Sequence, residues 1–285
     1  MKNLFFVLVI VFFNFQVFFA QEYIPTVADI RQFPQTKTMM VLEESLMSEY
    51  NFSIRDAAPD EWNITPFDFM EWRNFEAQKR DRTLSFLLIN NVTIENDKSN
   101  TRYLFMSLLL GGTNRSLANM PDLCSIPLAY DGADEETYTY KIGVFLHFIQ
   151  NHVKLLTDDP SIATKNVFQH YNKNIQELGD KTLYLIAEEL ADDVNTVEKI
   201  RRVYDGQFKL VTKEDIQRAI ADRDPNVVFL HKVGPSRNQA NTRCFKILVG
   251  AADAQFYYFD YHTINNRTPN GFLASDFRKL SRQNR

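Results

Sequence analysis

One stretch of sequence occurs twice: residues 37–46 read KTMMVLEESL, and residues 181–190 read KTLYLIAEEL, 144 positions later. The lysine, the threonine, one glutamate and the final leucine are identical, and apolar residues replace one another between them. Each copy begins as an apolar run that is typical of a buried strand. A long-period repeat changes every later assignment, so the pair decides how the rest of the chain is interpreted.

Further blocks recur in the same order along the chain. Residues 64–68 match 211–215, residues 84–87 match 227–230, and residues 100–102 match 241–243. The shared order predicts an internal duplication. It divides the chain into residues 1–20 as a signal peptide, 21–36 as an N-terminal extension, 37–157 as repeat domain 1, 158–180 as a linker helix and 181–285 as repeat domain 2.

Local signals give the order of elements within each repeat. Thr212 is expected to cap a helix, with Asp215 at its third position, and Thr65 is expected to cap the matching helix, with Pro66 at its first position. Three closely spaced apolar runs follow in the second repeat, at residues 226–232, 243–250 and 255–263, with a terminal helix over 272–280. Links this short require antiparallel pairing.

The resulting order β-α-β-α-β-β-β-α predicts an α/β fold made of two tandem related domains. Each sheet is expected to be mixed, parallel at its start and antiparallel at its end, and a helical linker is expected to join the domains. In coarse order the repeats resemble the small α/β modules of exported bacterial envelope proteins such as the N-terminal domain of TolB. That resemblance concerns the fold alone.

The first twenty residues are typical of a signal peptide. Lys2 precedes an apolar run that ends at the small residue Ala20, which predicts cleavage after Ala20 and export to the periplasm or the extracellular space. An uncleaved N-terminal anchor is the alternative. No later segment is long and apolar enough to span a membrane.

Composition excludes several classes. A net charge of −4 argues against nucleic-acid binding. Two cysteines, Cys124 and Cys244, are too few for a disulfide scaffold, and both are expected to be buried and unpaired, with a bridge as the alternative. Five Asn-x-Ser/Thr sequons would matter only in a host that glycosylates secreted proteins.

No sequence signature of a known catalytic site occurs, and no cofactor-binding motif is present. The candidate catalytic residues are His231, Asp260 and His262, because alternation along residues 256–262 places Asp260 and His262 on one face of a strand. The candidate metal ligands are Asp131, Asp134 and Glu135, which lie in an acidic loop with a glycine.

The same strand is unusually aromatic, which suggests a contact surface. Its candidate partner-binding residues are Phe256, Tyr257, Tyr258, Phe259 and Tyr261, on a strand whose edge could accept a partner strand. The sequence therefore predicts an exported, non-catalytic protein that binds a protein or envelope partner and needs no cofactor. The alternative is a solute-binding protein or a hydrolase-like enzyme with its site in a cleft between the repeats.

Overall fold

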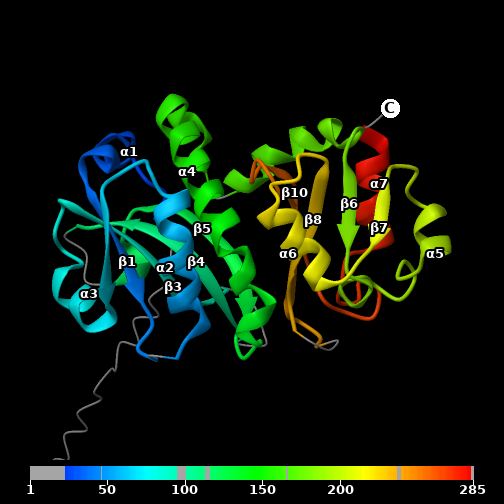
Figure 1. Cartoon of the computed structure of the whole chain (residues 1–285), viewed down its shortest axis with the longest axis horizontal. Helices are drawn as coiled ribbons and strands as arrows, with labels where there is room; N and C mark the ends of the chain where they lie inside the picture. The colour runs from blue at the N-terminus through cyan, green and yellow to red at the C-terminus, as the bar shows by residue number, and fades with distance from the viewer. Residues whose placement is uncertain are drawn as a thin grey trace, which may run out of the picture.

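Two five-stranded sheets with the same strand order form the framework of the protein (Figure 1). The computed structural model describes residues 23–45, 47–94, 101–112, 116–164, 166–235 and 239–283, so the predicted signal peptide lies outside the described residues. The order is β2-β1-β3-β4-β5 in one sheet and β7-β6-β8-β9-β10 in the other. In each, the first strand pairs in parallel with the second and third, and the last two strands are antiparallel to their neighbours. This confirms the predicted α/β class with two similar units.

The elements have the following bounds. The first unit contains α1 (Val27–Gln32), β1 (Lys37–Leu42), α2 (Glu49–Glu61), β2 (Phe67–Glu71), α3 (Trp72–Gln78), β3 (Leu84–Thr93), β4 (Arg102–Leu110), β5 (Asp122–Tyr130) and α4 (Ile142–Asp158). The second contains β6 (Thr182–Leu185), α5 (Val197–Arg201), β7 (Phe208–Leu210), α6 (Lys213–Ala221), β8 (Val227–Val233), β9 (Arg243–Gly250), β10 (Phe256–Thr263) and α7 (Ala274–Gln283). The 3₁₀ helices include η3 (Glu135–Thr137), η4 (Thr139–Lys141), η5 (Pro160–Ile162), η6 (Val167–Leu178) and η7 (Ala187–Glu189).

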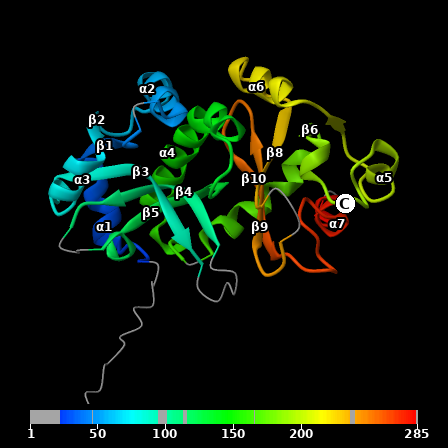
Figure 2. The same ribbon diagram turned by 90° about the horizontal axis from the view of Figure 1, so that it is seen from below.

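The helices form three layers around the two sheets (Figure 2). One apolar core joins α1, α2, α4 and α6 to strands of both sheets, so these four helices form the central layer. A second core lies under α5 and α7 on the far side of the second sheet, and a third lies under α3 on the far side of the first. In the first unit α2 and α4 cover the side of the sheet that faces the second unit, and in the second unit α5 and α7 cover the side that faces away from the first. The equivalent sides of the two sheets therefore point in the same direction.

Helix α4 belongs to both units. Phe145 and Phe148 are buried on this helix, and the Phe148 ring is stacked on Phe256 of the second sheet, with 3.5 Å between centroids and 7° between ring planes. Phe145 contacts the ring of His231 at 4.8 Å. Apolar side chains therefore fill the space between the units in the described part of the chain, where a cleft was one alternative.

The repeat alignment needs two corrections. Thr65 caps no helix; its hydroxyl bonds to the hydroxyl of Thr38 at 2.6 Å and accepts from the Trp62 indole at 3.0 Å, and a strand follows it. The alignment of residues 37–46 with 181–190 is shifted by one residue. The α2 side of the first sheet is equivalent to the α5 side of the second. Met40 of β1 packs on the former, and Leu183 and Leu185 of β6 pack on the latter. Side chains alternate between the faces of a strand with a period of two, so an offset of 144 would place even-numbered residues of both strands on equivalent faces. Met40 is even-numbered, whereas Leu183 and Leu185 are odd-numbered, so the true offset is odd.

The predicted linker helix is replaced by 3₁₀ structure in η5 and η6. In η6 the buried Phe168, Tyr171 and Asn174 recur every three residues, which fits three residues per turn. The residues before the first strand, predicted as an extension, form α1 with a capping box between Thr26 and Asp29. The predicted capping box of Thr212 and Asp215 is confirmed at the start of α6.

We expect stability to fall in acid because of His152, which joins α4 to η6. Its Nδ1 lies 2.7 Å from the Tyr171 hydroxyl, and burial, with the charge of His170, lowers its pKa from 6.5 to about 3. Between those two pH values the unfolded chain holds a proton that the folded chain does not. The free energy of unfolding should therefore fall by about 1.4 kcal/mol per pH unit as the pH drops from 6.5 towards 3.

The measurement is denaturant unfolding at several pH values for the native chain and for His152→Gln. The carboxylates titrate equally in both proteins, so the difference between the two curves isolates His152. Parallel curves across pH 6 to 4 would show that His152 does not carry this dependence.

Candidate functional site

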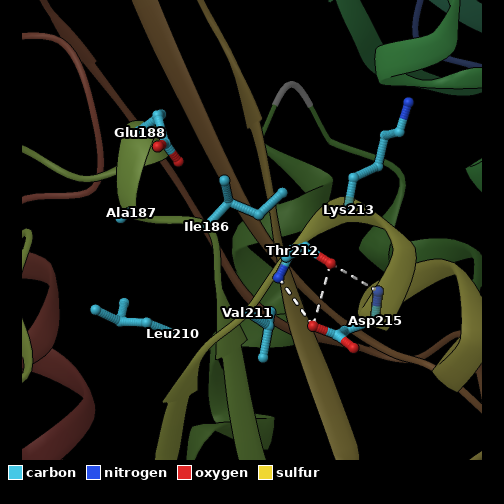
Figure 3. A pocket seen from close by; sticks show the side chains of 8 residues that line it. All are labelled: Ile186, Ala187, Glu188, Leu210, Val211, Thr212, Lys213 and Asp215. Atoms are coloured by element: carbon cyan, nitrogen blue, oxygen red, sulfur yellow. Dashed lines mark hydrogen bonds between the residues drawn. The ribbon is translucent and has the colours of Figure 1, made fainter.

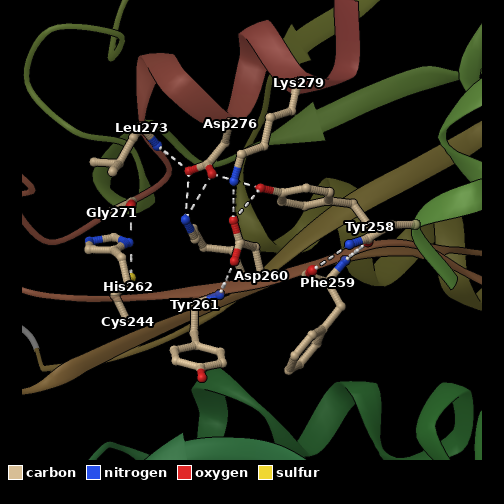
Figure 4. A network of polar contacts seen from close by, with 12 residues as sticks. Cys244, Tyr258, Phe259, Asp260, Tyr261, His262, Gly271, Leu273, Asp276 and Lys279 are labelled. Atoms are coloured by element: carbon tan, nitrogen blue, oxygen red, sulfur yellow. Dashed lines mark hydrogen bonds and ion pairs between the residues drawn. The ribbon is translucent and has the colours of Figure 1, made fainter. Parts of the chain in front are cut away.

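Asp260 and His262 lie under α7, in a network that ties this helix to the second sheet (Figure 4). Its centre is a buried ion pair, in which Lys246 Nζ lies 2.8 Å from both carboxylate oxygens of Asp276. The Tyr258 hydroxyl donates to Asp276 at 2.7 Å and the Leu273 backbone N–H donates to it at 2.8 Å. The network holds the start of α7 against β9 and β10.

Asp260 and His262 are both engaged at the rim of this network. Asp260 forms an ion pair with Lys279 of α7. Burial raises the pKa of Asp260, but the hydrogen bond from Lys279 and the charge of Lys246 outweigh it and leave the pKa below its usual value. His262 Nε2 lies 2.8 Å from the Pro269 carbonyl, and burial lowers the pKa of His262, which favours the neutral ring. The two share a face, as predicted, and each has its own structural partner.

His231 does not join them, because it lies on the opposite face of the sheet. It is opposite Ile247, which in turn is opposite Phe259, whereas Asp260 is opposite Lys246. A register difference of one residue reverses the face. The predicted grouping of His231 with Asp260 and His262 is therefore wrong.

His231 instead joins the two units. Its Nε2 lies 3.0 Å from the Pro127 carbonyl of β5, so Nε2 carries the proton, and its Nδ1 accepts from Lys141 Nζ at 3.2 Å. Burial and the charge of Lys141 lower the pKa of His231, which agrees with the neutral ring. Burial also lowers the pKa of Lys141 and raises that of Glu189, while the opposite charges of these two residues limit both shifts. His231 and Lys141 are buried between the two units, so this pair serves the interface.

The aromatic strand is buried. Phe256, Tyr257, Tyr258 and Phe259 are at most 9% exposed, and only Tyr261 is exposed, at 38%. A bulge between Phe256 and Tyr258 puts Phe256 on the α4 side and Tyr258 on the α7 side, so the predicted alternation fails at Phe256.

The edge of β10 is covered by η6. Asn172 Oδ1 accepts from the Phe259 backbone N–H at 2.7 Å, and Asn172 Nδ2 donates to the Phe259 carbonyl at 3.0 Å. Asn174 donates to the Phe256 carbonyl at 2.8 Å. The side chains of η6 thus occupy the positions of a neighbouring strand, which protects the edge from strand addition. The predicted contact surface over 256–259 is closed in this structure.

Asn172→Ala is expected to lower the free energy of unfolding by about 1–3 kcal/mol, because both backbone groups of Phe259 lose their partner next to a packed core. Asn166→Ala is the matched control, since the Asn166 side chain caps nothing at the start of η6. Chemical denaturation of both variants measures the effect. Equal stability of the two variants would show that water replaces Asn172 without cost.

The acidic loop has structural roles. Asp131 forms an ion pair with Arg102 at 2.9 Å. Glu135 accepts from the Tyr50 backbone N–H at 3.1 Å and from the Ser48 hydroxyl at 3.3 Å, which neutralises the start of α2. Asp134 precedes η3 without a side-chain cap bond. Within the described ranges, no three His, Cys, Asp or Glu side chains are arranged to hold a metal ion, and both cysteines are buried and unpaired.

A pocket of about 500 Å³ lies at the carboxyl ends of β6 and β7 (Figure 3). Ile186 and Glu188 line it from the segment after β6, and Leu210, Val211, Lys213 and Asp215 line it from the end of β7 and the start of α6. The helices that follow these two adjacent strands cover opposite faces of the sheet, α5 on one and α6 on the other. In the order β7-β6-β8 the strand order reverses between β6 and β8, so the pocket lies beside the topological switch point, at the carboxyl ends of the strands, where open α/β sheets bind their ligands.

Backbone hydrogen bonds to Phe272 hold the loop that carries Glu188. The Phe272 backbone N–H donates to the Glu189 carbonyl at 2.9 Å, and the Ala191 N–H donates to the Phe272 carbonyl at 3.0 Å. Gly271 has a φ of +120°, and a Cβ there would lie 2.7 Å from Ala191 N, so only glycine fits. None of the pocket residues is predicted from the sequence as a candidate for function, although Thr212 and Asp215 are predicted as a helix cap. The order strand, helix, strand, helix, strand was the signal that could have located them.

No family model, curated protein or solved structure matches the chain in the comparisons with known proteins. Among the described residues, the helices are too short or too polar to cross a membrane.

Proposed function

We propose that this is an exported, non-catalytic binding protein whose binding site is the pocket at the carboxyl ends of β6 and β7. The observation that carries the proposal is an open pocket at the carboxyl ends of two adjacent parallel strands of the second sheet, beside its switch point. The partner is a protein that inserts one side chain into the pocket. The proposed site thus differs from the aromatic strand 256–261, which is mostly buried.

The absence of catalysis is supported by what the candidate residues already do. Asp260 and His262 fasten β10 to α7 and to the following loop, and His231 joins the two units. A general base must have room for a substrate proton within hydrogen-bond reach. Asp260, His231 and the Nε2 atom of His262 have structural partners instead, and the remaining Nδ1 of His262 is buried away from a substrate.

Export rests on the pattern of residues 1–20. N-terminal sequencing of the protein recovered from its native host tests it: a mature chain that begins at Gln21 supports export with cleavage. A chain that retains Met1 in the cytoplasmic fraction would overturn it.

Site-directed photo-crosslinking tests the binding site. A photoreactive residue replaces Leu210 in the pocket, and a matched variant carries it at Ser275, on the exposed outer side of α7. In the native envelope we expect one protein adduct from position 210 and none from position 275. Equal labelling from both positions, or none from 210, would overturn the protein-partner proposal.

A free solute is the second candidate, because about 500 Å³ falls within the usual range of small-molecule sites. Native mass spectrometry of protein purified from its host distinguishes the two. A bound small molecule that is lost on Val211→Asp, with no protein adduct from position 210, would favour the solute.

A further inference from the structure

We propose that the pocket binds an aliphatic cation, that is, an ammonium or guanidinium group on a short apolar chain. The inference rests on the proposed function, because it names the ligand class of the same pocket. The source is either a lysine or arginine side chain of a partner or a free alkylamine. Both present the same chemistry to the pocket.

The pocket walls are suited to an apolar chain. Ile186 and Val211 contribute branched side chains that also pack against the core shared by both units, and Leu210 packs against the core under α5. Their positions are therefore fixed before any ligand binds. Burial of a few methylene groups against such walls favours binding, because it removes apolar surface from water.

The positive groups at the pocket are already neutralised. The Asp215 carboxylate accepts from the Thr212 backbone N–H and hydroxyl, each at 3.1 Å, so the start of α6 carries its own carboxylate. Lys213 points away from the other lining side chains in Figure 3 and pairs with Glu136 of the first unit at 3.0 Å. The site thus offers little to an anion.

The carboxylate of Glu188, by contrast, is not neutralised by a partner in the described part of the chain. Glu188 is exposed, and in the described part of the chain no hydrogen bond or ion pair engages its carboxylate. The hydrogen bond to Glu136 and the charges of Glu214 and Glu49 raise the pKa of Lys213, so several carboxylates surround this single lysine. An acidic rim of this kind attracts cations and repels anions.

The test is an NMR titration of the full mature chain with probes of equal length: n-pentylamine, 1-pentanol and pentanoate. The methyl resonances of Leu210 and Val211 report on binding in the pocket. We expect saturable shifts with the amine and binding at least about tenfold weaker for the alcohol and the carboxylate. Glu188→Gln should weaken amine binding about tenfold, whereas Asp193→Asn, an exposed carboxylate in the following loop, should leave it unchanged.

Each outcome separates this inference from the proposed function. If pentanol or pentanoate shifts the pocket methyls as well as the amine does, or if Glu188→Gln binds the amine normally, the cation inference fails while the pocket remains a binding site. If no probe shifts Leu210 or Val211, the cation inference fails, and the crosslinking from position 210 decides the proposed function separately. A capped tripeptide with central lysine that binds tighter than pentylamine would assign the source to a partner side chain, and the reverse order would assign it to a free amine.

Discussion

Asp276→Ala is expected to lower the free energy of unfolding by about 3–5 kcal/mol, because it leaves the ammonium group of Lys246 buried without its counter-charge. The two side chains are 2% and 1% exposed, so water cannot replace the lost carboxylate. The same change removes the acceptor of the Leu273 N–H and one of the two acceptors of the Tyr258 hydroxyl, which keeps Asp260 at 3.0 Å. Urea unfolding followed by circular dichroism measures the loss.

A double variant separates the charge from the packing. Lys246→Met with Asp276→Leu removes both charges and keeps similar volumes, and we expect it to recover most of the lost stability. A single Asp276→Ala variant within 1 kcal/mol of the native chain would contradict the prediction, and so would a double variant less stable than the single one.

Phe148→Ala is expected to cost about 3–5 kcal/mol and to destabilise both units together. Phe148 is 1% exposed and stacked on Phe256, within a core that contains residues of both sheets. Phe52→Ala removes the same ring from α2, where it is 58% exposed, and should change stability by less than about 0.5 kcal/mol.

The unfolding profile provides a second measurement on the same protein. Because the central layer is shared, we expect one cooperative transition for the native chain and for Phe148→Ala. Two separate transitions, with only one moved by the substitution, would show that the units unfold independently.

The sequence was sufficient where a signal is local. The capping box of Thr212 and Asp215 requires only residues three apart, and the short spacings after residue 226 required antiparallel pairing. The order of elements then determined the fold class. The placement of Thr65 failed because its hydroxyl bonds to Thr38, a partner that becomes close only in the folded sheet.

The site residues depended on relations that a single strand does not encode. Whether His231 shares a face with Asp260 is decided by the register across β9, and the bulge after Phe256 has no signature in the aromatic run. Asn172 protects the strand edge from a segment almost ninety residues away. The pocket residues Ile186 and Leu210 are ordinary apolar residues, and only the topology makes them a cavity.

The shared direction of the two units has a consequence for self-assembly. Two copies related by a two-fold axis form a closed pair, whereas a head-to-tail arrangement can in principle add further copies without limit. Here the exposed side of α7 presents Ser275, Arg278 and Lys279, and the exposed side of α3 presents Arg73, Asn74 and Glu76. In the described part of the chain these two faces present charged and polar side chains where α4 presents apolar ones to the second unit, so a head-to-tail contact between copies would have to bury these charged groups.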